Sequence, residues 1–282
     1  MELTENKNYP AQLFDRYLRI LGIEKHSPTL QNLQILTASH LCKIPFENVL
    51  KLYKVKVQNI REYPDLYEYL DNIENNNFGG TCFTNNYYIN LLMNYLGYDV
   101  KLCSADIAVA SAASDSHMLN VVLVDGREVV VDVGYGAPFW KAFYRDSDQD
   151  IAMNFGLDKY VLKPENENGC NKLEVYHNEE LVHGYLLKPF RKTLIDFQNV
   201  IHASYQDSGT FINRLVFVKF DENKITALRN NKITMSTPNS SQVTLLQNRQ
   251  DIQNALVQEY KIPSVIAQDV VSSLDDTILF GT

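Results

Sequence analysis

The sequence has 282 residues, and 45% of them are hydrophobic, which predicts a globular protein with an ordinary buried core. Its 26 basic and 34 acidic side chains give a net charge of −8, which argues against binding of nucleic acid through a general basic surface. The four cysteines are too few and too scattered for a disulfide scaffold, and without a Cys-x-x-Cys pair they do not suggest a zinc ribbon. They are Cys42, Cys82, Cys103 and Cys170.

The first residues and the apolar runs of the chain do not suggest export or membrane insertion. In residues 1–7 no apolar run follows the charges, so we expect no signal peptide. No stretch of the sequence approaches the length of a membrane span. We therefore expect a cytoplasmic protein with reduced thiols that binds neither a membrane nor nucleic acid.

The first third of the chain is predicted to be helical. Apolar side chains recur at helical spacing over residues 9–21 and again over residues 30–36. We interpret Ser27-Pro28 as an N-cap followed by a proline at the first helical position of the second helix. A third helix is expected from about Asn85 to Leu96, and Gly97 ends it.

After Gly97 the pattern becomes typical of strands. Asp125-Gly126 lies between two β-branched runs, residues 117–124 and 128–133, and this is a strong signal for a two-residue hairpin. Several short strands in succession predict a small barrel or a sandwich. The other strand-like segments are residues 99–109, 159–163, 173–176 and 181–187.

The last third mixes strands and helix. A meander is expected from three short strand-like runs, with turns at 221–223 and 230–231. A helix containing Ile252 and Leu256 follows, and Ile262-Pro263 ends it. The strand-like runs are residues 214–220, 224–228 and 232–235.

Cys82 is the thiol most suited to chemistry. Gly79-Gly80 gives the backbone unusual freedom just before it, and the helix predicted from Asn85 begins shortly after it. A thiol at a helix N-terminus meets the positive end of the dipole and unpaired N–H groups, which favour the nucleophilic thiolate. A lone cysteine is more often a buried core residue, so this interpretation needs a base.

His117 is the histidine that the strand register singles out as that base. If Asp125-Gly126 is a two-residue turn, Val124 pairs with Arg127, and His117 is then the diagonal neighbour of Asp132 on one face of the sheet. Such neighbours lie roughly 7–8 Å apart, within reach of an aromatic side chain. The sequence has six histidines, His26, His40, His117, His177, His183 and His202.

Asp132 interrupts the apolar run of residues 129–133, and a buried carboxylate needs a partner. A histidine on the next strand is a natural one, because the carboxylate would hold the imidazole in one tautomer and stabilise the imidazolium. Gly134-Tyr135-Gly136 follows directly. A Gly-x-Gly turn beside a catalytic carboxylate could let a phosphate or pantetheine chain approach the backbone.

Taken together, four ordered segments resemble the arylamine N-acetyltransferase family. They are Lys43-Ile44-Pro45-Phe46-Glu47-Asn48, residues 78–86 (Phe-Gly-Gly-Thr-Cys-Phe-Thr-Asn-Asn), Ser116-His117-Met118-Leu119, and residues 131–136 (Val-Asp-Val-Gly-Tyr-Gly). Weaker similarity to the family lies at Asp196-Phe197 and at residues 208–211. The specific motifs cover about residues 43 to 136, and beyond them the resemblance rests on element order and length.

The resemblance implies an α+β fold with a papain-like, cysteine-protease-like arrangement of a Cys–His–Asp triad. It divides the chain into a helical bundle with the nucleophile (residues 1–97), a β-barrel with the histidine and aspartate (98–210) and an α/β lid (211–282). The implied chemistry is ping-pong transfer of acetyl from acetyl-CoA to an arylamine or hydrazine, as in xenobiotic metabolism. Cys82 would be the nucleophile, His117 the base and Asp132 the residue that orients it.

The resemblance also implies contacts with the two substrates. Phe46 and Tyr135 match aromatic positions of the acceptor pocket, and we expect Gly134 and Gly136 to contact acetyl-CoA, with no metal. Residues 98–210 hold 10 basic and 17 acidic side chains, most of the net negative charge, so CoA must be held through local contacts. We expect the partners to be a small-molecule amine and CoA, and the protein to be a monomer or a homodimer.

Three residues depart from the family's motifs. Phe78 stands where the family has arginine before Gly-Gly, Thr84 stands where it has glutamate, and Lys43 replaces another arginine. Because Phe78 makes no ion pair, Glu47 must find another partner or lie in water. The departures leave two alternatives open: a cysteine hydrolase or transglutaminase-like enzyme with the same triad, and a catalytically weakened homologue that binds CoA or another small molecule.

Overall fold

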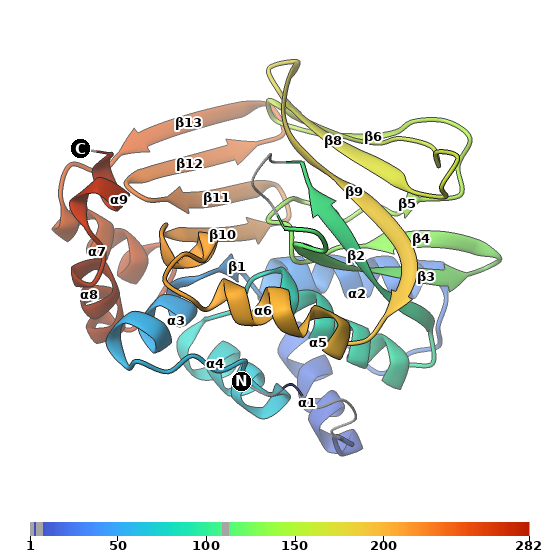
Figure 1. The fold of residues 1–282 in the computed structure, drawn as a ribbon, viewed down its shortest axis with the longest axis horizontal. Helices are drawn as coiled ribbons and strands as arrows, with labels where there is room; N and C mark the ends of the chain where they lie inside the picture. Colours follow the sequence, from blue (N-terminus) through green and yellow to red (C-terminus); the bar gives the residue numbers. More distant parts are fainter. Residues whose placement is uncertain (1–2, 4–7, 109–112, 282) are drawn as a thin grey trace.

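The computed structural model describes residue 3, residues 8–108 and residues 113–281. The expectation for the N-terminal residues 1–2 and 4–7, and the last residue of the strand predicted over 99–109, lie outside the described residues. The chain folds as an α+β protein with helices, a barrel-like sheet and a second sheet (Figure 1).

The N-terminal helices pack around a core of leucine and tyrosine side chains. The second helix is capped by Thr29 rather than by Ser27, because the Thr29 hydroxyl accepts the Asn32 N–H at 3.2 Å and Pro28 precedes the cap. Four longer helices and two short ones that run into each other make up this part. They are α1 (Ala11–Leu21), α2 (Leu30–Lys43), α3 (Val49–Leu52), the π-helix η1 (Tyr53–Val57), α4 (Leu66–Asn76) and α5 (Cys82–Tyr95).

Helix α5 begins three residues earlier than predicted. The Asn85 N–H donates to the Thr81 carbonyl at 3.0 Å, so the first helical bond closes directly after the glycines and Cys82 becomes the first helical residue. The predicted end is confirmed, because Gly97 has a φ of +88° and its N–H bonds to Asn94.

An eight-stranded antiparallel sheet curls into a nearly closed barrel, with the strand order β5-β4-β3-β2-β9-β8-β7-β6 (Figure 1). The Asp125-Gly126 hairpin is confirmed, since Val124 pairs with Arg127 and Asn120 with Val131, as the two-residue turn requires. The strands are β2 (Asp99–Ile107), β3 (His117–Val124), β4 (Arg127–Val131), β5 (Phe143–Tyr144), β6 (Ile151–Phe155), β7 (Asp158–Leu162), β8 (Asn171–His177) and β9 (Glu180–Lys192).

A second sheet, with the order β1-β10-β11-β12-β13, joins the helical first part of the chain to its last part. Strand β1 (Phe46–Glu47) comes from the helical part and pairs with β10. The expected meander is confirmed in its first three strands, β10 (Val216–Asp221), β11 (Lys224–Arg229) and β12 (Lys232–Thr237), and gains β13 (Ser240–Leu245).

Helices complete this region. The linker from the barrel contains η2 (Ile195–Phe197), α6 (Gln198–Ser204) and η3 (Thr210–Ile212). Three C-terminal helices lie beside the second sheet (Figure 1). Their apolar side chains share a buried cluster with Phe217, Leu228 and Ile233 of that sheet. They are α7 (Arg249–Gln258), α8 (Ser264–Ser272) and α9 (Asp276–Phe280). Within the described ranges, no helix is both long enough and apolar enough to cross a membrane.

Candidate active site

Cys82 lies at the first position of α5 and is 5% exposed. The tight path of the preceding loop requires glycine twice. A Cβ on Gly79 would meet the Pro45 carbonyl oxygen at 2.0 Å, and a Cβ on Gly80 would meet the Thr84 hydroxyl at 1.9 Å. The backbone N–H groups of the first helical turn have no carbonyl partner within α5, so Cys82 sits at the positive end of the helix dipole.

His117 and Asp132 come together from neighbouring strands. His117 is the first residue of β3, and Asp132 directly follows β4. The His117 Nε2 and Asp132 Oδ2 atoms are 2.7 Å apart, and the two residues are 2% and 1% exposed. The other carboxylate oxygen of Asp132 accepts hydrogen bonds from the Asn86 amide at 2.9 Å and the Gly134 N–H at 3.1 Å. The register argument from the sequence therefore predicted this proximity correctly.

Cys82 acts on His117 as a hydrogen-bonding and charged neighbour that raises the pKa of the imidazole, so Cys82, His117 and Asp132 lie next to one another. With Nε2 directed at Asp132, Nδ1 is the ring nitrogen left for the thiol. Burial opposes the charged form of His117, but the charge and hydrogen bond of Asp132, together with Cys82, raise the pKa of His117 above its usual value. The arrangement favours an imidazolium beside the thiol.

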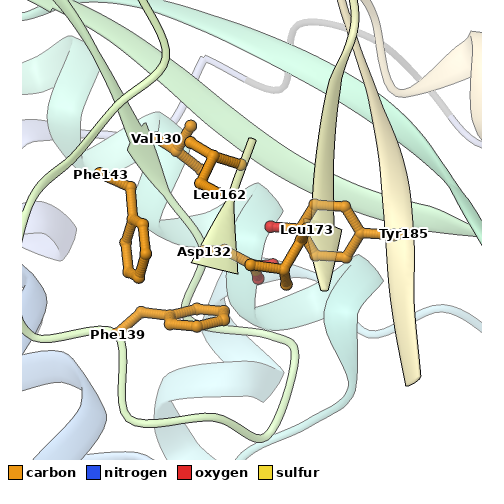
Figure 2. A pocket seen from close by; sticks show the side chains of 7 residues that line it. All are labelled: Val130, Asp132, Phe139, Phe143, Leu162, Leu173 and Tyr185. Atoms are coloured by element: carbon orange, nitrogen blue, oxygen red, sulfur yellow. The ribbon is translucent and has the colours of Figure 1, made fainter. Parts of the chain in front are cut away.

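Aromatic rings enclose the imidazole. The Tyr185 ring stacks on His117 at 5.2 Å between centroids, and Tyr135 meets it edge-on at 5.4 Å. Behind Asp132, the barrel interior holds a small cavity (Figure 2). Its other lining side chains are apolar or aromatic, so they keep the surroundings of the carboxylate poor in water. They are Val130, Phe139, Phe143, Leu162, Leu173 and Tyr185.

The residues expected to contact the substrates lie in or next to the loop of residues 134–136, which follows Asp132. Phe46 packs edge-on against Phe211, with 5.7 Å between ring centroids. Gly136 has a φ of +76°, and a Cβ there would come within 3.1 Å of the Phe46 ring. A Cβ on Gly134 would come within 2.6 Å of the Cys82 Cα. Both glycines are thus needed for packing within the protein, and their contact with acetyl-CoA stays a prediction.

The departures from the family's motifs have a structural explanation. Phe78 is fully buried in an apolar cluster with Val49, Leu52 and side chains of α7 and α8. Glu47, 1% exposed, accepts hydrogen bonds from the Gly79 N–H at 3.2 Å and the Leu50 N–H at 3.1 Å. Burial raises the pKa of Glu47 to about 7, against the lowering effect of its backbone hydrogen bonds. Glu47 therefore finds backbone partners in place of an arginine.

The other two departures from the family's motifs, Thr84 and Lys43, change the surroundings of Cys82 less. Thr84 donates its hydroxyl to the Thr81 carbonyl at 3.1 Å and so closes the first turn of α5 from within. Lys43 is exposed at the end of α2.

Asn86 is a site residue that the sequence reasoning quoted but gave no role. Its amide donates to the Met118 carbonyl at 2.6 Å and to Asp132, and its oxygen accepts the Val133 N–H at 2.9 Å. It thus joins α5 to β3 and to the segment that directly follows β4. The signal was its spacing, because a residue four positions after Cys82 lies on the same face of the helix.

The remaining thiols lack such surroundings. Burial raises the pKa of Cys103 to about 12, and burial together with the acidic side chains Asp221 and Glu222 raises that of Cys42. No group of three or more His, Cys, Asp or Glu side chains within the described residues is arranged to hold a metal ion.

Comparison with known proteins gives the family. A family model described as N-acetyltransferase matches residues 29–269. An N-malonyltransferase of Fusarium pseudograminearum is 30% identical over 118 residues, which are 37% of this chain and 34% of the relative, so the match spans about a third of that relative's length.

Solved structures share the fold. The arylamine N-acetyltransferase of Mycobacterium abscessus superposes with a TM-score of 0.78 at 15% identity, over 92% of this chain and 94% of that one. The Mycobacterium marinum enzyme, solved in complex with CoA, gives 0.78 at 16% identity, over 95% and 100%. These structures confirm the expected papain-like α+β fold, and the model match over most of the sequence shows that the chain belongs to the N-acetyltransferase family.

Proposed function

We propose that the protein is an acetyl-CoA-dependent arylamine N-acetyltransferase that works by a ping-pong mechanism through an acetylated Cys82. The observation that carries the proposal is the buried His117–Asp132 pair beside Cys82, which is the first residue of a helix in a chain of this family. The arylamine acceptor is supported by the names of the fold relatives, and CoA by the M. marinum complex.

In the first half-reaction the Cys82 thiolate attacks the thioester carbonyl carbon of acetyl-CoA. The new Sγ–C bond forms, the carbon–sulfur bond to CoA breaks, and His117 gives its proton to the departing CoA thiolate. The N–H groups at the start of α5, which have no carbonyl partner within the helix, are suited to stabilise the oxyanion that develops between these events. CoA leaves as the thiol, and His117 is left neutral.

In the second half-reaction the amine nitrogen attacks the acetyl carbon on Cys82. The N–C bond forms and the Sγ–C bond breaks, while neutral His117 takes the proton that the amine loses. The thiolate and the imidazolium are thereby restored together. Asp132 keeps the imidazole oriented and stabilises its charged form throughout. Phe46 and Tyr135 would form the aromatic walls for the acceptor, and Gly134 and Gly136 the backbone that CoA approaches.

Intact-mass spectrometry tests the proposal directly. Mixing the protein with acetyl-CoA alone should add one acetyl group, and the Cys82→Ser variant should gain none. Addition of an arylamine or hydrazine should then remove the group and yield the acetylated amine. If the wild type gains no acetyl group while a thiol assay finds Cys82 free, the proposal is wrong. Loss of the acetyl group to water alone, with no dependence on amine, would indicate a cysteine hydrolase instead.

We also propose the division into residues 1–97, 98–210 and 211–282, a cytoplasmic location with a role in xenobiotic metabolism, and a monomer or homodimer. The division follows the change from helices to barrel to second sheet, although β1 crosses it. Size-exclusion chromatography with light scattering measures the oligomeric state. The N-malonyltransferase name of the curated relative makes malonyl-CoA a second donor to test beside acetyl-CoA.

A further inference from the structure

Strand β13 forms an open edge of the second sheet. It pairs with β12 on one side, and among the described residues no strand lies on its other side (Figure 1). The other terminal strands differ from it. Strand β1 has only two residues and its free side bridges Gly80, whereas β5 and β6 are the two ends of the nearly closed barrel. Strand β13 is therefore the long edge that is open to a further strand.

The sequence of β13 lacks the features that usually keep an edge strand from pairing. Those features are a charged side chain, a proline within the strand or a bulge. Residues 233–248 contain no Asp, Glu, Lys or Arg, Pro238 lies in the turn before the strand, and the register with β12 has no shift. Because each chain has a net charge of −8, two copies meet with least repulsion at such an uncharged segment.

The register shows which backbone groups of β13 point outward. Residues 238–239 form a two-residue turn, so Thr237 and Ser240 are a hydrogen-bonded pair. Hydrogen-bonded and non-hydrogen-bonded pairs alternate along an antiparallel ladder. The N–H and C=O groups that point away from β12 are therefore those of Ser241, Val243 and Leu245. The Leu245 carbonyl accepts the exposed Gln247 side-chain amide at 3.0 Å, and a carbonyl oxygen can accept a second hydrogen bond.

The large apolar side chains of β13 are exposed. Val243 and Leu245 are 51% and 57% exposed, and they lie on one face of the sheet because side chains alternate along a strand. On that face Val243 is the neighbour of Thr234 of β12, and the Ser241 hydroxyl is hydrogen-bonded to that of Ser236. The outer border of this face thus presents two apolar side chains beside the outward backbone groups.

We propose that β13 is the interface of a homodimer, in which the β13 strands of two copies pair antiparallel about a two-fold axis at Val243. In this register Val243 lies opposite Val243 of the partner subunit, and Ser241 lies opposite Leu245 of the partner subunit. Every outward backbone group of β13 then has a partner. Moving the axis by one residue in either direction would leave one of the three outward residues opposite a residue outside the strand.

The side chains are complementary in this register. A row of β-branched side chains crosses the axis, because Val243 is flanked by Thr234 on one side and by Val243 of the partner subunit on the other. Leu245 is then the diagonal neighbour of Val243 of the partner subunit, so the exposed apolar side chains cover one another. Lys232, which pairs with Leu245, is in a row with Ser241 of the partner subunit, so no like charges meet.

The expected dimer is weak and depends on concentration. The paired edge has only six residues, which is less than a standard protein–protein interface provides. Its formation does not depend on the acyl transfer proposed above, so it is measured on the purified protein without substrates. Failure of the dimer and failure of the proposed function are therefore distinguishable.

Sedimentation velocity tests the dimer over protein concentrations from about 1 µM to about 500 µM. The wild type should pass from monomer to dimer within this range. Val243→Lys should raise the dissociation constant about tenfold or more, because two like charges meet at the axis and the valine contact is lost. Val265→Lys, at a 65% exposed valine on α8, is the matched control and should dimerise as the wild type does. Far-UV circular dichroism checks that each variant is folded.

Two results of this experiment would overturn the proposal. A wild type that stays monomeric at every concentration excludes the dimer and leaves the edge to a strand of another protein. A Val243→Lys variant that dimerises with the wild-type dissociation constant shows that the copies meet at another surface.

Engineered cysteines test the register. In Val243→Cys the two cysteines lie directly opposite each other, with Cα atoms about 5.5 Å apart, which a disulfide can span. Mild oxidation should therefore cross-link this variant. Leu245→Cys places its two cysteines several residues from each other and should not cross-link, whereas the double variant Ser241→Cys, Leu245→Cys should. Non-reducing electrophoresis measures the products, and the wild type controls for its native thiols. Efficient cross-linking of Leu245→Cys, or none of Val243→Cys, contradicts the axis at Val243.

Backbone amide exchange gives a measure that needs no substitution. The N–H groups of Val243 and Leu245 point outward, so their hydrogen exchange should slow as the protein concentration rises. Those of Gln242 and Thr244 are directed at β12 and should be protected at every concentration. If the sedimentation coefficient rises with concentration while the exchange of Val243 and Leu245 stays constant, the dimer does not form through β13.

Discussion

At the scale of single residues, two carboxylates beside the nucleophile have opposite surroundings. Asp132 has a histidine as its partner, whereas the two oxygens of Glu47 accept from the backbone N–H groups of Gly79 and Leu50. The difference arises from Phe78, which stands where the family has an arginine and packs its side chain in an apolar cluster. The sequence could show that Glu47 loses its ion-pair partner, but the backbone donors that replace it depend on the path of the loop.

Removing the Asp132 charge should disable the triad. In Asp132→Asn the imidazolium loses its stabilising carboxylate and its tautomer is no longer fixed, so we expect kcat to fall about 10³–10⁴-fold. Alkylation of Cys82 by iodoacetamide at pH 6 should slow as well, because the imidazolium next to the thiol loses the carboxylate that stabilises it. Asp158→Asn is a matched control, since it removes the 2.7 Å contact with His177 at an exposed site. Equal activity of the two variants would refute the role of Asp132.

Glu47 should make the stability of the protein depend on pH. Its pKa of about 7 in the folded protein lies above the ordinary 4.5, so the folded state binds this proton more tightly than the unfolded chain does. Glu47 therefore costs stability as the pH rises from about 4.5 to about 7, by up to about 3 kcal/mol.

Glu47→Gln carries no such charge. Its free energy of unfolding should thus rise relative to the wild type between pH 5 and pH 8, as measured by urea titration at each pH. Glu222→Gln, at an exposed turn, serves as the control and should follow the wild type. Parallel curves for Glu47→Gln and the wild type would show that this carboxylate does not titrate as described.

At the scale of elements, the residues of a turn predict the β3–β4 hairpin. Strand β13 and the start of α5 depend instead on contacts with distant parts of the chain, which the local sequence does not show. Asp125-Gly126 fixes the register of β3 and β4, and the register in turn brings His117 to Asp132. Strand β13 was missed because Ser240-Ser241-Gln242 lacks an apolar face and is held only by pairing with β12. The sequence predicts a later start for α5 than the structure shows. The helix begins directly after the glycine loop, and that loop is held by the bridge between Phe46 of β1 and Gly80.

The close approach of the Gly134 loop to α5 gives a prediction at this scale. In Gly134→Ala the new methyl group would overlap the Cys82 Cα and the Asn86 amide, so the loop with Asp132 must move away from the helix. A displacement of about 1 Å is enough to lower kcat about a hundredfold.

A matched substitution separates this effect from the general cost of replacing a glycine. Gly126→Ala, at an exposed turn with a φ of +75° and no atom within 4 Å of the new Cβ, should lower stability by about 1 kcal/mol and leave kcat unchanged. The kcat of each variant and its urea midpoint make the comparison. A Gly134→Ala enzyme with the wild-type kcat would contradict the tight fit.

At the scale of the whole molecule, the first and last parts of the chain are joined. Strand β1 pairs with β10, and the Asn48 amide donates to the carbonyls of Phe211 and Arg214, each at 2.7 Å. The Asn48 oxygen in turn accepts the Val216 N–H at 2.8 Å. No local pattern could predict this, because a two-residue strand has no periodicity and its partner lies far along the chain.

We therefore expect the protein to unfold in one transition. Trp140, the single tryptophan, packs edge-on against Phe155 of the barrel and Phe220 of the second sheet, so its fluorescence reports on their contact. Its urea transition should coincide with that of far-UV circular dichroism. Asn48→Ala should shift both transitions together by about 3 kcal/mol, because several buried groups lose their partners. A separate, earlier fluorescence transition would show that the sheet detaches on its own.

Strand β1 has a consequence for how motion of the second sheet would reach the nucleophile. One side of this strand pairs with β10, and the other forms a parallel bridge from Phe46 to Gly80, two residues before Cys82. The second sheet is thus linked through one two-residue strand to the loop that precedes α5. A displacement of this sheet would be transmitted to the nucleophile along that strand, without passing through the barrel.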